Sequence, residues 1–122
     1  VILVVEDDER VRQLTVRRLK MIGHDVIEAR DGVEALNLLQ SGAHVDLVFT
    51  DMIMPGGLSG RDVAHRARDL KPGIKVLLTT GYAEDLGHAD DLESESLKVL
   101  RKPYRQAELA MALREVLDVA LP

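Results

Sequence analysis

An aspartate lies at the end of a buried apolar stretch, where a lone charge requires either a compensating partner or a function. The segment Val45–Pro55 carries an apolar run, Leu47 to Phe49, toward Asp51, and the chain then turns away at Met54-Pro55-Gly56-Gly57. The carboxylate of Asp51 is therefore expected at the tip of a strand. A carboxylate in such a place can act as a nucleophile or as a metal ligand.

Further polar residues end or follow the other apolar runs, and these are Glu6, Asp7, Thr80 and Lys102. If the three carboxylates converge to about 4 Å, each pair repels by roughly 4 kcal/mol at an effective dielectric near 20. A cation is then needed, and oxygen ligands without cysteine or suitably spaced histidines favour Mg²⁺. Lys102 adds a point charge for a phosphoryl oxygen and Thr80 adds a hydroxyl donor. The set predicts phosphoryl transfer onto an aspartate, or binding of a phosphate that is already present.

Each of these residues also has an ordinary structural explanation. Acidic residues between a strand and a helix often cap the helix, which applies to Asp8 and Glu9. A lone Lys-Pro pair is common in turns, and a threonine at a strand end is usually structural. The functional interpretation depends on all the residues meeting at one edge of one domain.

The predicted elements bring them to such an edge. Strands are expected at Val1–Val5, Val26–Ala29, the stretch that ends at Asp51, Ile74–Thr80 and Lys98–Arg101. Helices are expected from about Asp8 to Ile22, Val33 to Gln40, Ser59 (as N-cap) to Leu70, Ala83 to Leu92 and Arg105 to Ala120. This alternation predicts an α/β fold with a parallel sheet and helices on both faces. Right-handed crossovers then place the carboxyl ends of all strands on one edge, where ligands bind.

The helices are expected to bury the apolar stripes that a period of 3.6 residues defines. The expected inward residues are Val11, Leu14, Leu19 and Ile22, then Ala35, Leu36 and Leu39, then Val63, Ala64, Ala67 and Leu70, and finally Leu109, Ala110, Leu113, Val116, Leu117 and Ala120. Within the first of these helices, Val16 is expected to point away from the stripe.

The composition narrows the class of protein. A chain of 122 residues with 46% hydrophobic and 30% charged residues fits one globular domain rather than a disordered segment. A net charge of −5 argues against a nucleic-acid surface, and the absence of cysteine excludes disulfides and thiol catalysis. Without a membrane span or signal peptide, a cytoplasmic location is expected. The start at Val1 rather than methionine suggests a domain excised from a longer chain.

Four motifs together resemble the receiver (response-regulator) domain of two-component signalling. They are Val4 to Asp8, Thr50 to Pro55, Thr79 to Gly81 and Lys102 to Tyr104, and the resemblance spans residues 1–122 as a single domain. The sequence at Thr80-Gly81-Tyr82 and from Leu100 to Tyr104 looks most like that of receivers at the carboxyl end of hybrid sensor histidine kinases. The resemblance implies a flavodoxin-like, doubly wound, five-stranded parallel sheet in the order 2-1-3-4-5.

The resemblance also implies a role for each site residue. Asp51 would be the phosphoacceptor, attacking the phosphorus of a phosphohistidine. Asp7 and Asp51 would bind Mg²⁺ directly, Glu6 would reach it through water, and Ile53 would contribute its backbone carbonyl. These are the ligands of a hard divalent cation.

The resemblance further implies that Lys102 and Thr80 interact with the phosphoryl group, and that Pro103 and Gly81 shape the backbone around it. Lys102 would pair with the phosphoryl oxygens, and Pro103 would follow a cis peptide bond. Thr80 would move toward the phosphoryl group once it is present, and Gly81 would leave space for it to enter. Such a domain is no enzyme in the usual sense, although it catalyses its own phosphorylation and dephosphorylation.

The implied partner is a histidine kinase or a histidine phosphotransfer domain. This domain is not expected to contact nucleic acid or membrane. Formation of a weak homodimer is left as a possibility. The runner-up function is a pseudo-receiver, which keeps the fold as an interaction module without phosphorylation. A third is a small phosphatase with an aspartyl intermediate, but such enzymes carry a second acid where Ile53 stands.

The sequence departs from the family pattern at several positions. Glu6 replaces the commoner aspartate, and Val99 stands where many receivers carry the aromatic residue of the switch. Tyr82 and Tyr104 are therefore alternative switch aromatics. The loop from residue 56 to 60 is one residue longer than in many members, and the polar segment from 83 to 96 predicts a weak helix.

Overall fold

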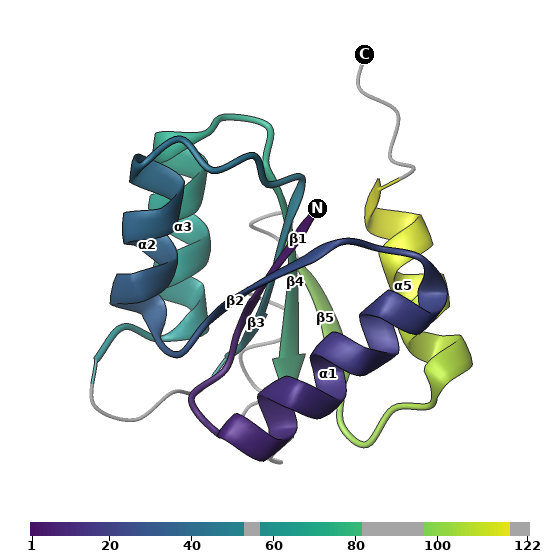
Figure 1. The fold of residues 1–122 in the computed structure, drawn as a ribbon. Helices are drawn as coiled ribbons and strands as arrows, with labels where there is room; N and C mark the ends of the chain where they lie inside the picture. Colours follow the sequence, from purple (N-terminus) through teal and green to yellow (C-terminus); the bar gives the residue numbers. More distant parts are fainter. Residues whose placement is uncertain (53–56, 82–96, 118–122) are drawn as a thin grey trace.

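Strands and helices alternate along the computed structural model, which describes residues 1–52, 57–81 and 97–117 (Figure 1). The elements are β1 (Ile2–Val5), α1 (Glu9–Ile22), β2 (Val26–Ala29), α2 (Gly32–Gln40), β3 (Leu47–Asp51), α3 (Gly60–Leu70), β4 (Lys75–Thr80), β5 (Lys98–Arg101) and α5 (Gln106–Leu117). The expected helix from Ala83 to about Leu92 lies outside the described residues. No helix within the described ranges is long and apolar enough to cross a membrane.

The five strands form one parallel sheet, as the alternation of elements predicted, in the order β2-β1-β3-β4-β5 that the resemblance implied. Helices α1 and α5 cover one face of this sheet, and α2 and α3 cover the other (Figure 1). The register pairs Val5 with Thr50, Asp51 with Thr79, and Thr80 with Arg101. The carboxyl ends of β1, β3, β4 and β5 are therefore nearly level at one edge.

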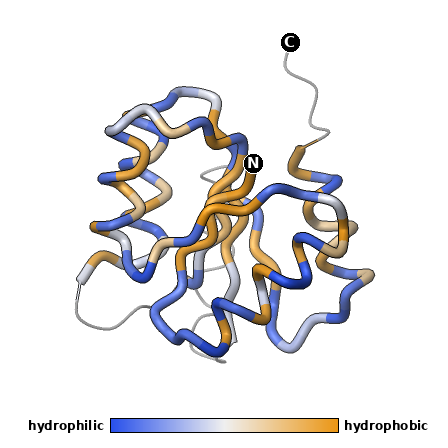
Figure 2. Tube along the Cα trace, viewed as in Figure 1, coloured by the Kyte–Doolittle hydropathy of each residue, from blue (hydrophilic) through white to orange (hydrophobic). Residues whose placement is uncertain are grey.

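The three central strands, β1, β3 and β4, are buried on both faces, so apolar residues run almost continuously through the centre of the molecule (Figure 2). Successive side chains alternate between two cores. The core beneath α2 and α3 takes Leu3, Val5, Val48, Val76 and Leu78 from the strands. The core beneath α1 and α5 takes Ile2, Val4, Leu47, Phe49 and Leu77. This alternation fixes which face each residue at a strand end belongs to.

Local capping fixes where the helices begin and end. The Asp8 carboxylate caps α1 by accepting the backbone N–H groups of Arg10 and Val11 at 2.9 and 3.1 Å. Gly23 ends α1 with a φ of 111°, which favours glycine. Ser59 and Asp62 form a capping box at the start of α3, with two hydrogen bonds of 3.1 Å. The predicted N-cap at Ser59 is confirmed.

The predicted buried face of α1 is wrong at its amino-terminal half. Val11 and Leu14 are 37% and 46% exposed, whereas Val16, expected to point outward, is buried with Leu19. The buried face instead continues through Thr15 and Arg12. Polar residues can occupy it because their hydrogen bonds are made inside the protein, as with the Thr15 hydroxyl, which donates to the Val11 carbonyl at 2.9 Å.

The other stripes need smaller corrections. In α2, Ala35, Leu36 and Leu39 are buried as predicted. In α3, Leu70 was predicted to be buried but is 40% exposed, as the last residue of the helix. In α5, Leu109, Leu113 and Val116 are buried as predicted, Ala112 joins them, and Ala110 is only partly buried.

Candidate functional site

An ion pair joins the ends of β3 and β5. Asp51 is the last residue of β3, and its Oδ2 accepts a hydrogen bond from Lys102 Nζ at 3.2 Å. The same ammonium lies 3.9 Å from Glu6 Oε1. The backbone N–H of Lys102 donates to the Thr80 carbonyl at 2.8 Å, which continues the pairing of β4 with β5. The sheet itself therefore directs Lys102 toward its central strand.

Glu6, directly after β1, is a buried carboxylate with 6% of its surface exposed. Its own N–H donates to the Ala29 carbonyl, and its Oε2 accepts the backbone N–H of Asp8 at 3.3 Å. Burial raises the pKa of Glu6 to about 7, and a side-chain hydrogen bond with Asp7 and the charge of Asp51 act in the same direction. The Asp8 hydrogen bond and the charge of Lys102 oppose this rise in pKa. Lys102 thus compensates the acidic site incompletely.

The donor chemistry of this edge fits a hard divalent cation. Glu6 interacts with both Asp7 and Asp51, and the three residues offer only carboxylate oxygens; the pKa of Glu6 is raised mainly by burial, with the charge of Asp51 acting in the same direction. Among residues 1–52, 57–81 and 97–117, no group of three acidic or histidine side chains is arranged so that it could by itself hold a metal ion. The predicted backbone ligand Ile53 lies outside these ranges. The structure therefore brings together Glu6 and Asp51, with Asp7 beside them on the turn after β1.

The two threonines at the end of β4 occupy different positions. Thr80, the predicted phosphoryl-responsive residue, is the last residue of β4 and is 2% exposed. Thr79 is the register partner of Asp51. A small cavity of about 10 Å³ is lined by Thr79 together with Asp51, Glu6 and Lys102. Thr79 was missed from the sequence, because the register of β3 with β4 is what places it on the same sheet face as Asp51.

Tyr104 also lines this cavity and connects it to α1. The guanidinium of Arg18 lies 5.5 Å from the centre of the Tyr104 ring, within the range of a cation–π contact. Gln106 strengthens the connection because its Nε2 donates to the Arg18 carbonyl at 2.9 Å. Of the two alternative switch aromatics, Tyr104 therefore lies at the site, and Tyr82 lies outside the described residues.

Glycines and a proline shape the backbone around the acidic cluster. The first residue of α3, Gly60, donates its N–H to the Met52 carbonyl at 2.9 Å. A Cβ on Gly60 would lie 2.2 Å from the Asp51 carbonyl oxygen. At Gly81 a Cβ would make only an ordinary contact, 3.6 Å from Lys102 Cδ. The Lys102–Pro103 peptide bond is cis, as predicted.

Replacing Glu6 with glutamine will stabilise the metal-free protein at pH 8. A carboxyl whose folded pKa is raised from 4.5 to about 7 contributes stability below pH 4.5, and this contribution is lost as the pH rises through 7. Glutamine keeps the oxygen that accepts the Asp8 N–H but carries no charge. The gain in unfolding free energy is expected to reach about 3 kcal/mol at pH 8. Urea denaturation with a chelator present measures it, and an equal gain at pH 4.5 would contradict the electrostatic explanation.

Comparisons with known proteins point to one family. The family model for the response regulator receiver domain matches residues 2–114. The sensor kinase CckA of Brucella abortus (strain 2308) is 37% identical over 119 residues, which are 96% of this chain but 12% of that protein. The receiver protein CpdR of the same strain is 31% identical over 119 residues and 98% of each chain.

Solved structures show the same fold. A receiver domain from Clostridium thermocellum superposes with a TM-score of 0.88 at 30% identity, over 96% of this chain and 93% of that one. The receiver domain of the hybrid histidine kinase CckA superposes with a TM-score of 0.76 at 30% identity, over 96% and 98% of the two chains. Together with the family match over residues 2–114, these similarities show that the chain belongs to the response regulator receiver domain family of two-component signalling.

Proposed function

We propose that this receiver domain accepts a phosphoryl group on Asp51 from a phosphohistidine, in a Mg²⁺-dependent reaction. The donor is a histidine kinase or a histidine phosphotransfer domain. The observation that supports this most is the 3.2 Å ion pair between Asp51 and Lys102 at the carboxyl edge of the sheet. It combines a carboxylate nucleophile with a cation suited to phosphoryl oxygens in one site.

The transfer needs little from the protein beyond position and charge. An oxygen of the Asp51 carboxylate attacks the phosphorus, the P–N bond to the imidazole breaks, and the imidazole leaves with the bonding electrons. Lys102 contacts Oδ2, so it limits rotation of the carboxylate, and it can follow the phosphoryl oxygens as negative charge builds on them. The 18% exposure of the Asp51 side chain lets a partner's histidine approach while most of the carboxylate stays out of bulk water.

Mg²⁺ would be held by the side chains of Asp7 and Asp51, by Glu6 through water, and by the backbone carbonyl of Ile53. When bound, the ion neutralises the charge that the phosphoryl group and the carboxylates share. Glu6 is well suited to a supporting role because its backbone N–H is fixed to Ala29 and its side chain is held by Asp8.

The phosphoryl group is proposed to switch the conformation of the domain. It adds about −1.5 to −2 charges next to Lys102, which biases an equilibrium between two states. Thr80 is proposed to move toward the new oxygens. Because the Thr80 carbonyl accepts the Lys102 N–H, a shift of either residue is transmitted between the ends of β4 and β5. The reaction is proposed to take place in the cytoplasm, and the output is regulation of a partner or an attached domain.

The experiment is incubation of the 122-residue chain with acetyl phosphate, with and without Mg²⁺, followed by intact-mass spectrometry. We expect the mass of one phosphoryl group to be added with Mg²⁺ and to be absent when a chelator removes the metal. Circular dichroism of both samples confirms that chelation leaves the fold intact. A folded protein that gains no phosphoryl group under either condition contradicts the proposal and points to an interaction module instead.

A further inference from the structure

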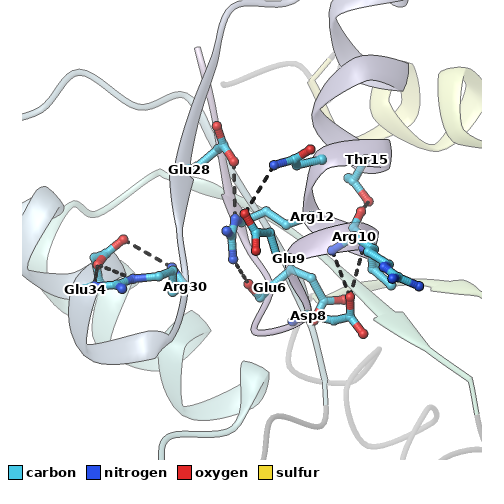
Figure 3. Close-up of polar contacts among 11 residues, drawn as sticks. Glu6, Asp8, Glu9, Arg10, Arg12, Thr15, Glu28, Arg30 and Glu34 are labelled. Carbon is cyan, nitrogen blue, oxygen red and sulfur yellow. Dashed lines mark hydrogen bonds and ion pairs between the residues drawn. The ribbon is translucent and has the colours of Figure 1, made fainter.

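A buried guanidinium lies under the acidic edge of the sheet. Arg12, on the inner side of α1, is only 9% exposed. Its Nη1 donates to the backbone carbonyl of Glu6 at 3.1 Å, and its Nε donates to Glu28 Oε1 on β2 at 3.2 Å (Figure 3). The side chain thus connects α1, the end of β1 and the edge strand β2.

The backbone is held on both sides of Glu6. The N–H of Glu6, in the peptide group before it, donates to the Ala29 carbonyl of β2. The C=O of Glu6, in the peptide group that joins Glu6 to Asp7, accepts from Arg12. The same turn is closed by two more hydrogen bonds, because Asp8 donates its N–H to Glu6 Oε2 and Arg12 donates its N–H to the Asp8 carbonyl. The plane of this peptide group sets the direction in which both acidic side chains leave the backbone.

Packing alone gives no reason for an arginine here. Of the other buried positions of the α1 face, Val16 and Leu19 are apolar and Thr15 is uncharged, and burial of a guanidinium is costly unless its hydrogen bonds are made. Arg12 directs one charged donor, Nη1, to a backbone carbonyl within the acidic turn and another, Nε, to Glu28 on β2. Glu28 is half-exposed, with 48% of its side chain accessible, and orients the guanidinium from the other side.

We propose that Arg12, oriented by Glu28, is a positioning residue that fixes the peptide between Glu6 and Asp7 and thereby directs the two carboxylates toward Asp51. The inference rests on the proposed function, since the acids are positioned for the Mg²⁺-dependent reaction. Arg12 acts through the backbone and touches neither the metal nor the phosphoryl group. Residues that orient metal ligands in this indirect way typically change metal affinity about 10–100-fold when they are replaced.

The test compares Arg12→Ala, Arg12→Lys and Glu28→Gln with the parent chain by calorimetric titration with Mg²⁺. Arg12→Ala is expected to weaken Mg²⁺ binding about 10-fold. Glu28→Gln keeps an oxygen acceptor and is expected to weaken it about threefold. Arg12→Lys is expected to fall between the parent chain and Arg12→Ala, because one ammonium cannot replace a planar fork that serves two partners.

Arg17→Ala is the matched control, since Arg17 is an exposed arginine of the same helix and its loss changes the net charge equally. It is expected to bind Mg²⁺ as the parent chain does. Phosphorylation by acetyl phosphate adds a second comparison. In Arg12→Ala the Mg²⁺ concentration for half-maximal rate is expected to rise about 10-fold, whereas the rate at saturating Mg²⁺ stays within about twofold.

A metal-free measurement separates positioning from loss of stability. The carbonyl-carbon chemical shift of Glu6 and the amide shift of Asp7 are expected to move in Arg12→Ala, while amides of α5 stay unchanged. If Arg12→Ala does not fold, the Mg²⁺ titrations of Arg12→Lys and Glu28→Gln test the positioning role instead. Unchanged Mg²⁺ affinity in the folded variants overturns the inference. A parent chain that binds no Mg²⁺ and takes up no phosphoryl group overturns the proposed function instead.

Discussion

Replacing Asp51 with asparagine will abolish phosphoryl uptake from acetyl phosphate. The asparagine amide has nearly the shape of the carboxylate but lacks the charged oxygen that attacks phosphorus. The fold is expected to persist, because Asp51 lies at the end of β3 and its side chain is 18% exposed rather than enclosed in the core. Intact-mass spectrometry after incubation with Mg²⁺ and acetyl phosphate measures the loss, and thermal denaturation checks the fold.

The matched control for this variant is Asp69→Asn, which removes one exposed carboxylate from α3. It is expected to take up one phosphoryl group, as the parent chain does. A phosphoryl mass that persists in Asp51→Asn would place the acceptor elsewhere in the chain and contradict the assignment of Asp51.

Replacing Gly60 with alanine is expected to have the largest effect on stability. The new Cβ would lie 2.2 Å from the Asp51 carbonyl oxygen and 2.9 Å from Met52 Cα, and both are backbone atoms that cannot rotate away. Helix α3 must therefore shift, which disturbs the packing of its buried residues Val63 and Ala64. Overpacking of this kind costs about 3 kcal/mol or more of unfolding free energy.

Urea denaturation of Gly60→Ala measures this loss, and Gly57→Ala is the control. A Cβ on Gly57 meets nothing within 4 Å, so that variant is expected to unfold at nearly the same urea concentration as the parent chain. Because the clash involves the backbone of Asp51, any folded Gly60→Ala protein is also expected to accept the phosphoryl group more slowly. Equal stability of the two variants would mean that α3 packs less closely on β3 than the structure indicates.

Much of the site could be predicted because its residues come directly after strands. In a parallel sheet the carboxyl ends of the strands share one edge, so knowing where β1, β3 and β5 end is enough to bring Glu6, Asp51 and Lys102 together. The ion pair of Asp51 with Lys102 at 3.2 Å confirms that reasoning. The strand order followed from the family resemblance and not from the strand patterns.

The residues that hold the site residues in place could not be predicted from the hydrophobic pattern of the sequence. Hydrophobic periodicity assigns charged residues to the solvent side, so it placed Val11 and Leu14 inward and gave Arg12 no role. The structure buries Arg12 because Glu6 and Glu28, which lie far from each other in sequence, both accept its hydrogen bonds. Such a partnership depends on tertiary contacts between β1, α1 and β2, which local spacing does not encode.

Thr79 illustrates a second limit of the sequence reasoning. The motif drew attention to Thr80, whereas the register of β3 with β4 places Thr79 opposite Asp51. Register depends on how two strands slide against each other, and a one-residue change moves each side chain to the other face. Alternation along β4 would have indicated Thr79 once the register was known.

The central claim, that Asp51 is the phosphoacceptor, is tested most directly by locating the phosphoryl group after Mg²⁺-dependent phosphorylation. Reduction with borohydride converts an acyl phosphate into a stable alcohol, and peptide mass spectrometry then identifies the modified residue. We predict a modification at Asp51 alone, dependent on Mg²⁺ and absent in Asp51→Asn. A modification at another carboxylate, or none in a folded protein saturated with Mg²⁺ and phosphodonor, would contradict the claim.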